Sequence, residues 1–386
     1  MQGERLYIST SQELRDFVGG LSDVAVIGID TEFMRERTYY AKLCLIQMAV
    51  ADDVAIIDPL TVDDLEPLFA LLRDRSVVKV LHAGSQDLEI FYQLMGEVPA
   101  PLFDTQLAAS LAGFPQQVGY GALLREVLGA DIDKADTFTD WSKRPLSETQ
   151  VAYALNDVRY LVPLYEHLLA GLERDERLQW LESDFERLED PSTYATVPEE
   201  QWRRLKRVSS LKRRQLAVAR EMAAWRELEA QRRDVPKRWV LGDESIVEIA
   251  RRAPTTADEV LAIRGVGDKL QRSAIKGVLA AVKRGLDVSE DELPLLERRR
   301  RAPAADIDGA VDLMVALVRL RAREHGVAMP VLASRDDLER LASGERDAHR
   351  LLEGWRRDIV GAELLDLLDG RLSLSLDDGV LHVDKR

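Results

Sequence analysis

The feature that most constrains this chain is an apolar run, residues 24–29, that leads directly into two carboxylates, Asp30 and Glu32. Such a run predicts a strand buried in the middle of a sheet. Alternate side chains of a strand share a face, so Asp30 and Glu32 point the same way. Two like charges at a buried strand end repel each other and lose hydration, which favours a cation between them. The alternative is two acids that end a strand in solvent, so a metal site needs further ligands.

Further polar residues follow at matching places in the predicted elements. Asp87 lies in the first turn after a buried strand, and Asp104 ends another short strand. Tyr153 and Asp157 share one face of a helix expected over 147–172, because they are four residues apart. Taken singly, Asp157 is typical of a solvated helix surface and Tyr153 of a packing residue. Their ordered combination with the strand carboxylates instead favours Mg²⁺ or Mn²⁺, which prefer oxygen ligands.

Residues 1–190 alternate between strands and helices, and three consecutive strands before the first long crossover predict a mixed sheet covered by helices, an α/β fold. From residue 191 onward the pattern is helical. The expected strands cover 5–8, 24–30, 43–50, 54–57 and 77–81. The expected helices of this region begin near residue 12 and cover 65–72, 87–95, 105–111, 122–128 and 147–172.

Composition narrows the functional classes. The one cysteine, Cys44, excludes a disulfide within the chain and fits a reducing compartment. Apolar runs stay well below the ~20 residues that span a bilayer, so no membrane contact and a cytoplasmic location are expected. The net charge of −15 is uneven, since residues 201–301 hold 25 Lys and Arg against 15 Asp and Glu. A local basic surface is therefore compatible with a nucleic-acid partner.

The order and spacing of the polar residues resemble the DEDD superfamily of 3′→5′ exonucleases, in the branch with tyrosine in its third motif. The surrounding residues resemble bacterial ribonuclease D over roughly 5–185. Five blocks carry the resemblance: 29–33, 81–89, 103–106, 140–146 and 153–158. The resemblance implies a ribonuclease H-like fold and a metal-dependent exoribonuclease. The implied substrates are transfer RNA precursors and other small structured RNAs, and the products are nucleoside 5′-monophosphates.

The resemblance also assigns roles to the catalytic residues. Two divalent ions, about 3.5–4 Å apart, would assist hydrolysis. Asp30 would bridge both ions, and Glu32 and Asp157 would complete the ligands of the ion that holds the attacking water. Asp87 would hold the second ion through water. Tyr153 would orient the water or the scissile phosphate, because a phenol with a pKa near 10 is a poor general base.

The remaining sequence suggests two helical modules. Residues 207–286 resemble the HRDC domain, and Gly265, Gly267 and Lys269 open a helix whose free N–H groups could meet a phosphate or only form a tight turn. A second, divergent HRDC-like module is expected to be mainly structural, with a hairpin over 372–383. The expected domains are 1–190 (exonuclease), 191–206 (linker), 207–290 (HRDC), 291–305 (basic linker) and 306–386 (second HRDC-like domain).

Several alternatives stay open on the sequence. Phe33 could stack on the terminal base or enter the core, and His82 could pack or face a phosphate. A DNA-directed exonuclease and a non-catalytic RNA-binding scaffold are the competing functions. Helicase activity and ATP are not expected, because the chain has no G-x-x-x-x-G-K-[ST] loop. A monomer is expected.

Overall fold

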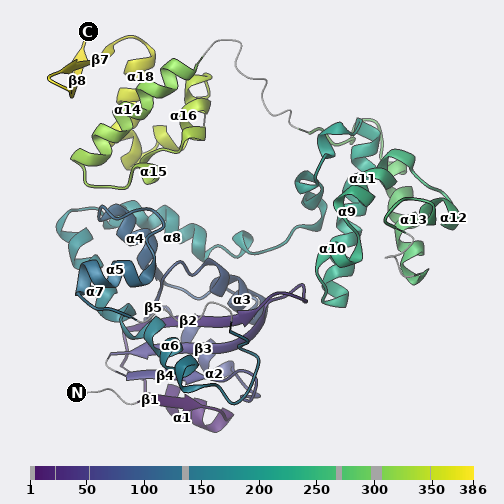
Figure 1. Ribbon diagram of the computed structural model, residues 1–386, viewed down its shortest axis with the longest axis horizontal. Helices are drawn as coiled ribbons and strands as arrows, with labels where there is room; N and C mark the ends of the chain where they lie inside the picture. Colours follow the sequence, from purple (N-terminus) through teal and green to yellow (C-terminus); the bar gives the residue numbers. More distant parts are fainter. Residues whose placement is uncertain are drawn as a thin grey trace. The chain divides into compact units, whose positions relative to one another are not determined.

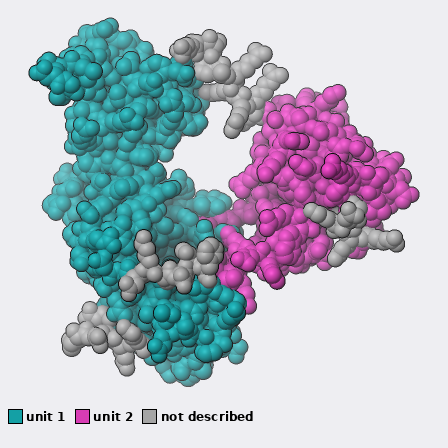
Figure 2. Space-filling view, viewed as in Figure 1, with its two compact units in different colours: residues 1–32, 44–193, 301–386 teal, residues 33–43, 194–300 magenta. Residues whose placement is uncertain are grey.

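The computed structural model describes residues 5–21, 23–51, 53–132, 139–266, 272–296, 307–347 and 349–386. Two compact units make up the chain, and each is described by itself (Figure 2). Unit 1 comprises Met1–Glu32, Cys44–Thr193 and Arg301–Arg386. Unit 2 comprises Phe33–Leu43 and Tyr194–Arg300. The expected exonuclease region therefore shares a unit with the C-terminal region.

Unit 1 is built on a six-stranded mixed sheet in the order β1-β4-β3-β2-β5-β6 (Figure 1). β1 is parallel to β4, β4 is antiparallel to β3, and β5 is parallel to both β2 and β6. The expected α/β class with a mixed sheet is thus confirmed. The strands are β1 Arg5–Ile8, β2 Val26–Met34, β3 Lys42–Val50, β4 Asp53–Ile57, β5 Val78–Leu81 and β6 Leu102–Asp104.

β2 is longer than the sequence predicts. It runs to Met34 instead of ending at Asp30, so both carboxylates lie inside the strand. The neighbouring β3 is buried from Leu43 to Val50, as its continuous apolar sequence predicts. A central strand of the sheet thus carries Asp30 and Glu32, which are themselves only partly buried by exposed surface.

The single long helix expected over 147–172 is wrong in detail, because the structure has two helices there. α6 ends at Arg159 and α7 begins at Leu161. Pro163 lacks a backbone N–H and cannot donate to the carbonyl four residues earlier, so an uninterrupted helix would lose a hydrogen bond at this point. The helices of this region are α1 Ser11–Gly19, α2 Glu66–Arg73, α3 Ser85–Met95, α4 Thr105–Leu111, α5 Tyr120–Leu128, α6 Glu148–Arg159, α7 Leu161–Arg174 and α8 Glu182–Glu189.

Unit 2 is helical, with a core of its own that includes Trp202, Met222, Ile249 and Val278. Its helices are α9 Arg213–Arg233, α10 Lys237–Val240, α11 Asp243–Arg252, α12 Ala257–Leu261 and α13 Arg272–Asp287. Phe33–Leu43 belongs to this unit through specific contacts: the Tyr39 hydroxyl donates to the buried Glu227, and the Tyr39 backbone N–H donates to Asp234 Oδ1 over 3.0 Å. The sequence did not predict this association.

The C-terminal part of unit 1 is also helical and ends in the expected hairpin. Its elements are α14 Asp308–Glu324, α15 Met329–Leu332, α16 Arg335–Ala342, α17 Gly354–Arg356, α18 Ala362–Leu368, β7 Leu372–Asp377 and β8 Val380–Lys385. Trp355 stacks on Trp180 with ring centroids 4.7 Å apart, and the Ala328 N–H donates to the Ser110 carbonyl over 2.9 Å. In the described part of the chain, no helix is long and apolar enough to cross a membrane.

Candidate active site

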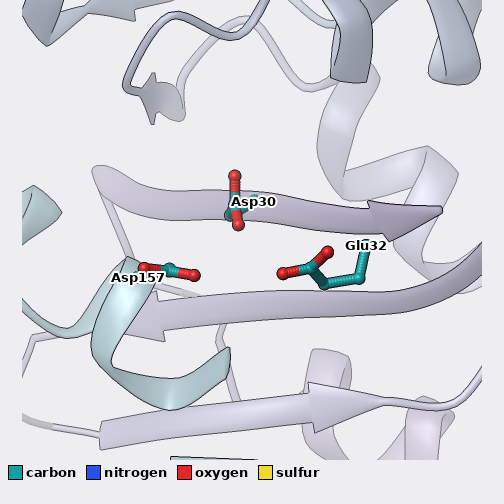
Figure 3. Close-up of side chains that lie close together, drawn as sticks. All are labelled: Asp30, Glu32 and Asp157. Atoms are coloured by element: carbon teal, nitrogen blue, oxygen red, sulfur yellow. The ribbon is translucent and has the colours of Figure 1, made fainter. Parts of the chain in front are cut away.

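Three carboxylates meet where β2 faces α6 (Figure 3). One carboxylate oxygen from each of Asp30, Glu32 and Asp157 lies within 4.8 Å of the other two. Asp30 and Glu32 come from the same strand two residues apart, and Asp157 comes from α6. The structure therefore brings together three of the four carboxylates that the sequence assigned to metal ions.

The missing side chain of Gly28 allows the start of α7 to lie close against β2. A Cβ atom built on Gly28 would lie only 2.8 Å from the Leu161 Cβ, so a larger residue would push the start of α7 away. The N-terminus of α6 is set by a capping box, in which the Ser147 hydroxyl accepts from the Gln150 N–H and the Gln150 side chain accepts from the Ser147 N–H. The cap fixes the start of α6, the helix that carries Asp157 ten residues later.

The carboxylates of the cluster are strained electrostatically. Burial raises the pKa of Asp30 well above its ordinary value, and the charges of Asp87, Asp157 and Glu32 raise it further. Burial and the neighbouring carboxylates raise the pKa of Glu32 to about 8. Burial raises the pKa of Asp157 to about 7, although a hydrogen bond from Tyr153 partly opposes this. A divalent cation would remove this repulsion, so the oxygen-rich cluster fits Mg²⁺ or Mn²⁺.

The other two expected catalytic residues lie beside this cluster. The Tyr153 hydroxyl is hydrogen-bonded to Asp157, and burial raises the pKa of the phenol above its ordinary value, so it stays protonated. Asp87 is 8% exposed in α3 and accepts a hydrogen bond from the Thr31 hydroxyl. Thr31 and Asp30 are adjacent in β2, so their side chains point to opposite faces of the strand. Asp87, which is bound to Thr31, therefore lies outside the group of three.

His82 has protein partners on both ring nitrogens. Nε2 lies 3.0 Å from the Val118 carbonyl, and Nδ1 lies 2.9 Å from the Thr105 hydroxyl. Burial lowers the pKa of His82, and the Thr105 hydroxyl also donates to the Leu81 carbonyl over 2.9 Å. These contacts favour the packing role for His82. Asp104 likewise caps α4, accepting the Gln106 and Leu107 N–H groups.

The remaining sequence-based candidates lie in unit 2. Phe33 is partly exposed and directly follows Glu32 in β2. Gly265 has φ +79°, so a positive-φ turn is formed here. Gly267 and Lys269 lie outside the described residues. The helix expected after this turn is described from Arg272 onward, as α13.

One residue of the site's face went unnoticed in the sequence. Gln47 is fully buried in β3, and neither atom of its amide has a hydrogen-bond partner among the described residues. A Cβ on Gly28 would lie 3.4 Å from the Ala49 Cβ, so these two positions share a face. Asp30 is two residues from Gly28 in β2, and Gln47 is two residues from Ala49 in β3, so both side chains project from that same face. A lone amide within the apolar run of β3 was the available signal.

The sheet, the carboxylate cluster and α6 together define a class of protein, the metal-dependent 3′→5′ exonucleases. A family model described as 3′-5′ exonuclease matches residues 6–173, and an HRDC domain model matches 215–282.

Relatives of similar length narrow the class to one family. Ribonuclease D of Gluconacetobacter diazotrophicus is 45% identical over 372 residues, which cover 96% of this chain and 94% of that protein. Ribonuclease D of Sphingobium indicum is 39% identical, with 98% of both chains covered. The crystal structure of Escherichia coli RNase D, described as an exoribonuclease involved in structured RNA processing, matches with a TM-score of 0.80 and 32% identity, covering 95% of this chain and 99% of that one. This chain belongs to the ribonuclease D family and is a 3′→5′ exoribonuclease.

Proposed function

We propose that this exoribonuclease trims the 3′ ends of transfer RNA precursors and other small structured RNAs, releasing nucleoside 5′-monophosphates by two-metal-ion hydrolysis. The observation that carries the proposal is the cluster of Asp30, Glu32 and Asp157, whose ligand oxygens lie within 4.8 Å of one another. The E. coli relative, described as acting in structured RNA processing, supports the substrate class.

The residues of the cluster would hold the metal ions in distinct ways. Asp30 would contribute to both ions, since it is the carboxylate whose pKa is raised by all three of its acidic neighbours. Glu32 and Asp157 would complete the ligands on one side, and Asp87 would serve the other. When bound, two divalent ions activate a water molecule, relieve charge on the phosphate and assist the leaving oxygen.

Tyr153 would act by position. Its hydroxyl stays protonated and is hydrogen-bonded to Asp157, one helical turn away. A protonated phenol can donate a hydrogen bond to the attacking water or to a phosphate oxygen, but it cannot remove a proton at neutral pH. Phe33 is the candidate for stacking on the terminal base.

The helical parts would guide the RNA. The HRDC domain lies within the basic stretch of 25 Lys and Arg against 15 Asp and Glu, whose side chains would contact phosphates without reading sequence. Gly265, Gly267 and Lys269 are the expected contacts there. Residues 306–386 would form a second HRDC-like domain with a mainly structural role, and the domain boundaries would be those that the sequence predicts. A monomer that needs no ATP and acts in the cytoplasm completes the proposal.

A direct test follows a 5′-labelled, 3′-extended transfer RNA in Mg²⁺, in Mn²⁺ and in EDTA, with the wild type and Asp30→Asn. Stepwise shortening from the 3′ end that needs both the metal and Asp30 supports the proposal. Intact RNA in every lane, with binding still measurable, contradicts catalysis and favours an RNA-binding scaffold. A matched single-stranded DNA tests the competing DNA-directed function, which equal shortening of the DNA would support.

A further inference from the structure

The segment that precedes α6 carries a motif without an assigned role. Residues 140–146 form one of the blocks that resemble ribonuclease D, yet none of them belongs to the carboxylate cluster. Trp141 is 8% exposed, and its ring centroid lies 6.0 Å from that of Tyr153, with 31° between the ring planes. Ser147, at the end of the segment, caps α6. Whatever holds this segment therefore affects where Tyr153 and Asp157 lie.

Arg144 holds the segment with every donor it has. A guanidinium group carries five N–H donors. Nε and one N–H of Nη2 bind the two oxygens of Asp58, over 2.5 and 2.7 Å. The second N–H of Nη2 donates to the Cys44 carbonyl over 2.7 Å. Nη1 donates to the carbonyls of Trp141 and Lys143, each over 2.8 Å. No donor is left for a phosphate.

Both carboxylate oxygens of Asp58 likewise accept hydrogen bonds from protein groups. Its side chain is 1% exposed, against 22% for Arg144. Besides Arg144, it accepts the Tyr7 hydroxyl over 2.6 Å and the Leu60 N–H over 3.0 Å. Tyr7 belongs to β1, Asp58 directly follows β4, and Cys44 lies in β3. The ion pair thus fastens the segment before α6 to three strands of the sheet.

We infer that Arg144 and Asp58 form a clamp that positions Trp141, and through it Tyr153 and the start of α6, for the exonuclease reaction. Arg144 is a positioning residue in this arrangement, and RNA does not touch it. A basic residue near a nuclease site would ordinarily be taken as a phosphate ligand, and the bonding of Arg144 opposes that reading. The inference rests on the proposed role of Tyr153.

The neighbouring Lys143 is the matched control. Its side chain is 79% exposed, and it forms an ion pair with Asp140, which lies 3.5 Å away and is itself 39% exposed. A lysine so placed can reach a phosphate, because it keeps donors free for solvent and ligand. Replacing it removes one positive charge from the same segment and leaves the Arg144–Asp58 contacts in place.

The experiment measures kcat and KM for a 3′-extended RNA at several salt concentrations. The variants are Arg144→Ala, Arg144→Lys, Asp58→Asn, Lys143→Ala, the double Arg144→Ala/Asp58→Asn, and Tyr153→Phe alone and with Asp58→Asn. We expect Arg144→Ala, Arg144→Lys and Asp58→Asn each to lower kcat by about 10- to 100-fold, since small misplacements of catalytic groups have effects of this size. Their KM and salt dependence should match the wild type.

The double variants separate positioning from general destabilisation. The Arg144→Ala/Asp58→Asn enzyme should be no slower than Arg144→Ala, and Asp58→Asn should add little to Tyr153→Phe, because effects within one unit are not additive. Each rate is measured below the unfolding midpoint of that variant. Tyr153→Phe alone tests the role of Tyr153, whereas the 144/58 pair tests the clamp, so the two can fail separately.

A different pattern would overturn the inference. If Arg144 binds phosphate, Arg144→Ala raises KM and lowers the slope of log KM against log salt by roughly 0.7–0.9, while Arg144→Lys keeps most activity. Asp58→Asn would then leave kcat at the wild-type value, since the guanidinium would still be available to RNA. Fully additive losses in both double variants would equally contradict a positioning role.

Discussion

Unit 1 contains two kinds of buried carboxylate: a cluster of three at the candidate active site, and a single one, Asp58, that is paired with an arginine. Comparing them distinguishes a candidate catalytic site from a structural ion pair. Asp30, Glu32 and Asp157 face one another, and their pKa values are raised. Asp58 is more buried than any of these by exposed surface, and burial alone would raise its pKa. Hydrogen bonds from Arg144 and Tyr7 instead hold it below the usual value. A buried carboxylate with its cation in place is structural, whereas a set of buried carboxylates without one is prepared for an added ion.

The largest effect should come from Asp30→Asn. If Asp30 binds the metal ions as proposed, its loss should lower kcat by about 10³-fold, because the charge stabilisation supplied by bound ions amounts to several kcal/mol. In EDTA at neutral pH, the same substitution should raise the free energy of unfolding, because a carboxyl whose pKa is raised in the folded state must bind a proton on folding, at a cost that the neutral Asn does not carry. Activity in Mg²⁺ and denaturant unfolding in EDTA measure the two changes. A less stable Asp30→Asn protein in EDTA would contradict the view of the cluster as strained.

Asp58→Asn should lower the free energy of unfolding, which Asp30→Asn should raise in EDTA. Its effect on kcat should be smaller than that of Asp30→Asn, while the free energy of unfolding should fall by about 2 kcal/mol, because a hydrogen-bonded charge on Arg144 loses its counter-charge. Urea unfolding of the wild type, Asp58→Asn and Asp30→Asn under one condition gives the comparison. Equal stability of Asp58→Asn and the wild type would remove the distinction between the two carboxylate sets.

Metal binding should depend on pH in the direction that the raised pKa values require. Without metal, the pKa of Glu32 is about 8 and that of Asp157 about 7, so both are largely protonated at pH 6. Metal ligation needs the ionised forms, so the apparent affinity for Mn²⁺ should rise at least about tenfold from pH 6 to pH 8, with proton release. Calorimetry in two buffers of different ionisation enthalpy measures both quantities. A pH-independent affinity without proton release would contradict the raised pKa values.

The smallest effect concerns acid stability. The folded-state pKa of Asp58 lies below its ordinary value near 4, so its stabilisation is fully present above about pH 4 and is lost as the pH falls through the folded-state pKa. The difference in unfolding free energy between the wild type and Asp58→Asn should therefore be constant from pH 5 to 7 and shrink below pH 4. A difference that grows on acidification would reverse the assigned sign.

The sequence was informative where local rules coincide with the tertiary environment. The apolar runs predicted strands 1 to 5 of the sheet, and the i, i+4 spacing placed Tyr153 and Asp157 on one face of α6. It was wrong where one residue interrupts a pattern: Pro163 divides the expected long helix, and β2 continues past Asp30 to Met34. A carboxylate inside a strand breaks the apolar pattern without ending the hydrogen-bond ladder, because backbone groups make the ladder.

By itself, the sequence determined the fold class and the family, and it predicted the acidic residues that meet in the cluster, because these follow from hydrophobic periodicity and from residues in fixed order. Only the tertiary structure decided which contacts those residues make. The association of Tyr39 with Glu227 joins positions 188 residues apart, and the pairing of Arg144 with Asp58 joins positions 86 apart. Such pairs leave no local pattern, since a single Arg, Asp or Tyr has many possible partners. Only the folded structure shows that protein groups accept all the N–H donors of Arg144, and that Asp30, Glu32 and Asp157 face one another.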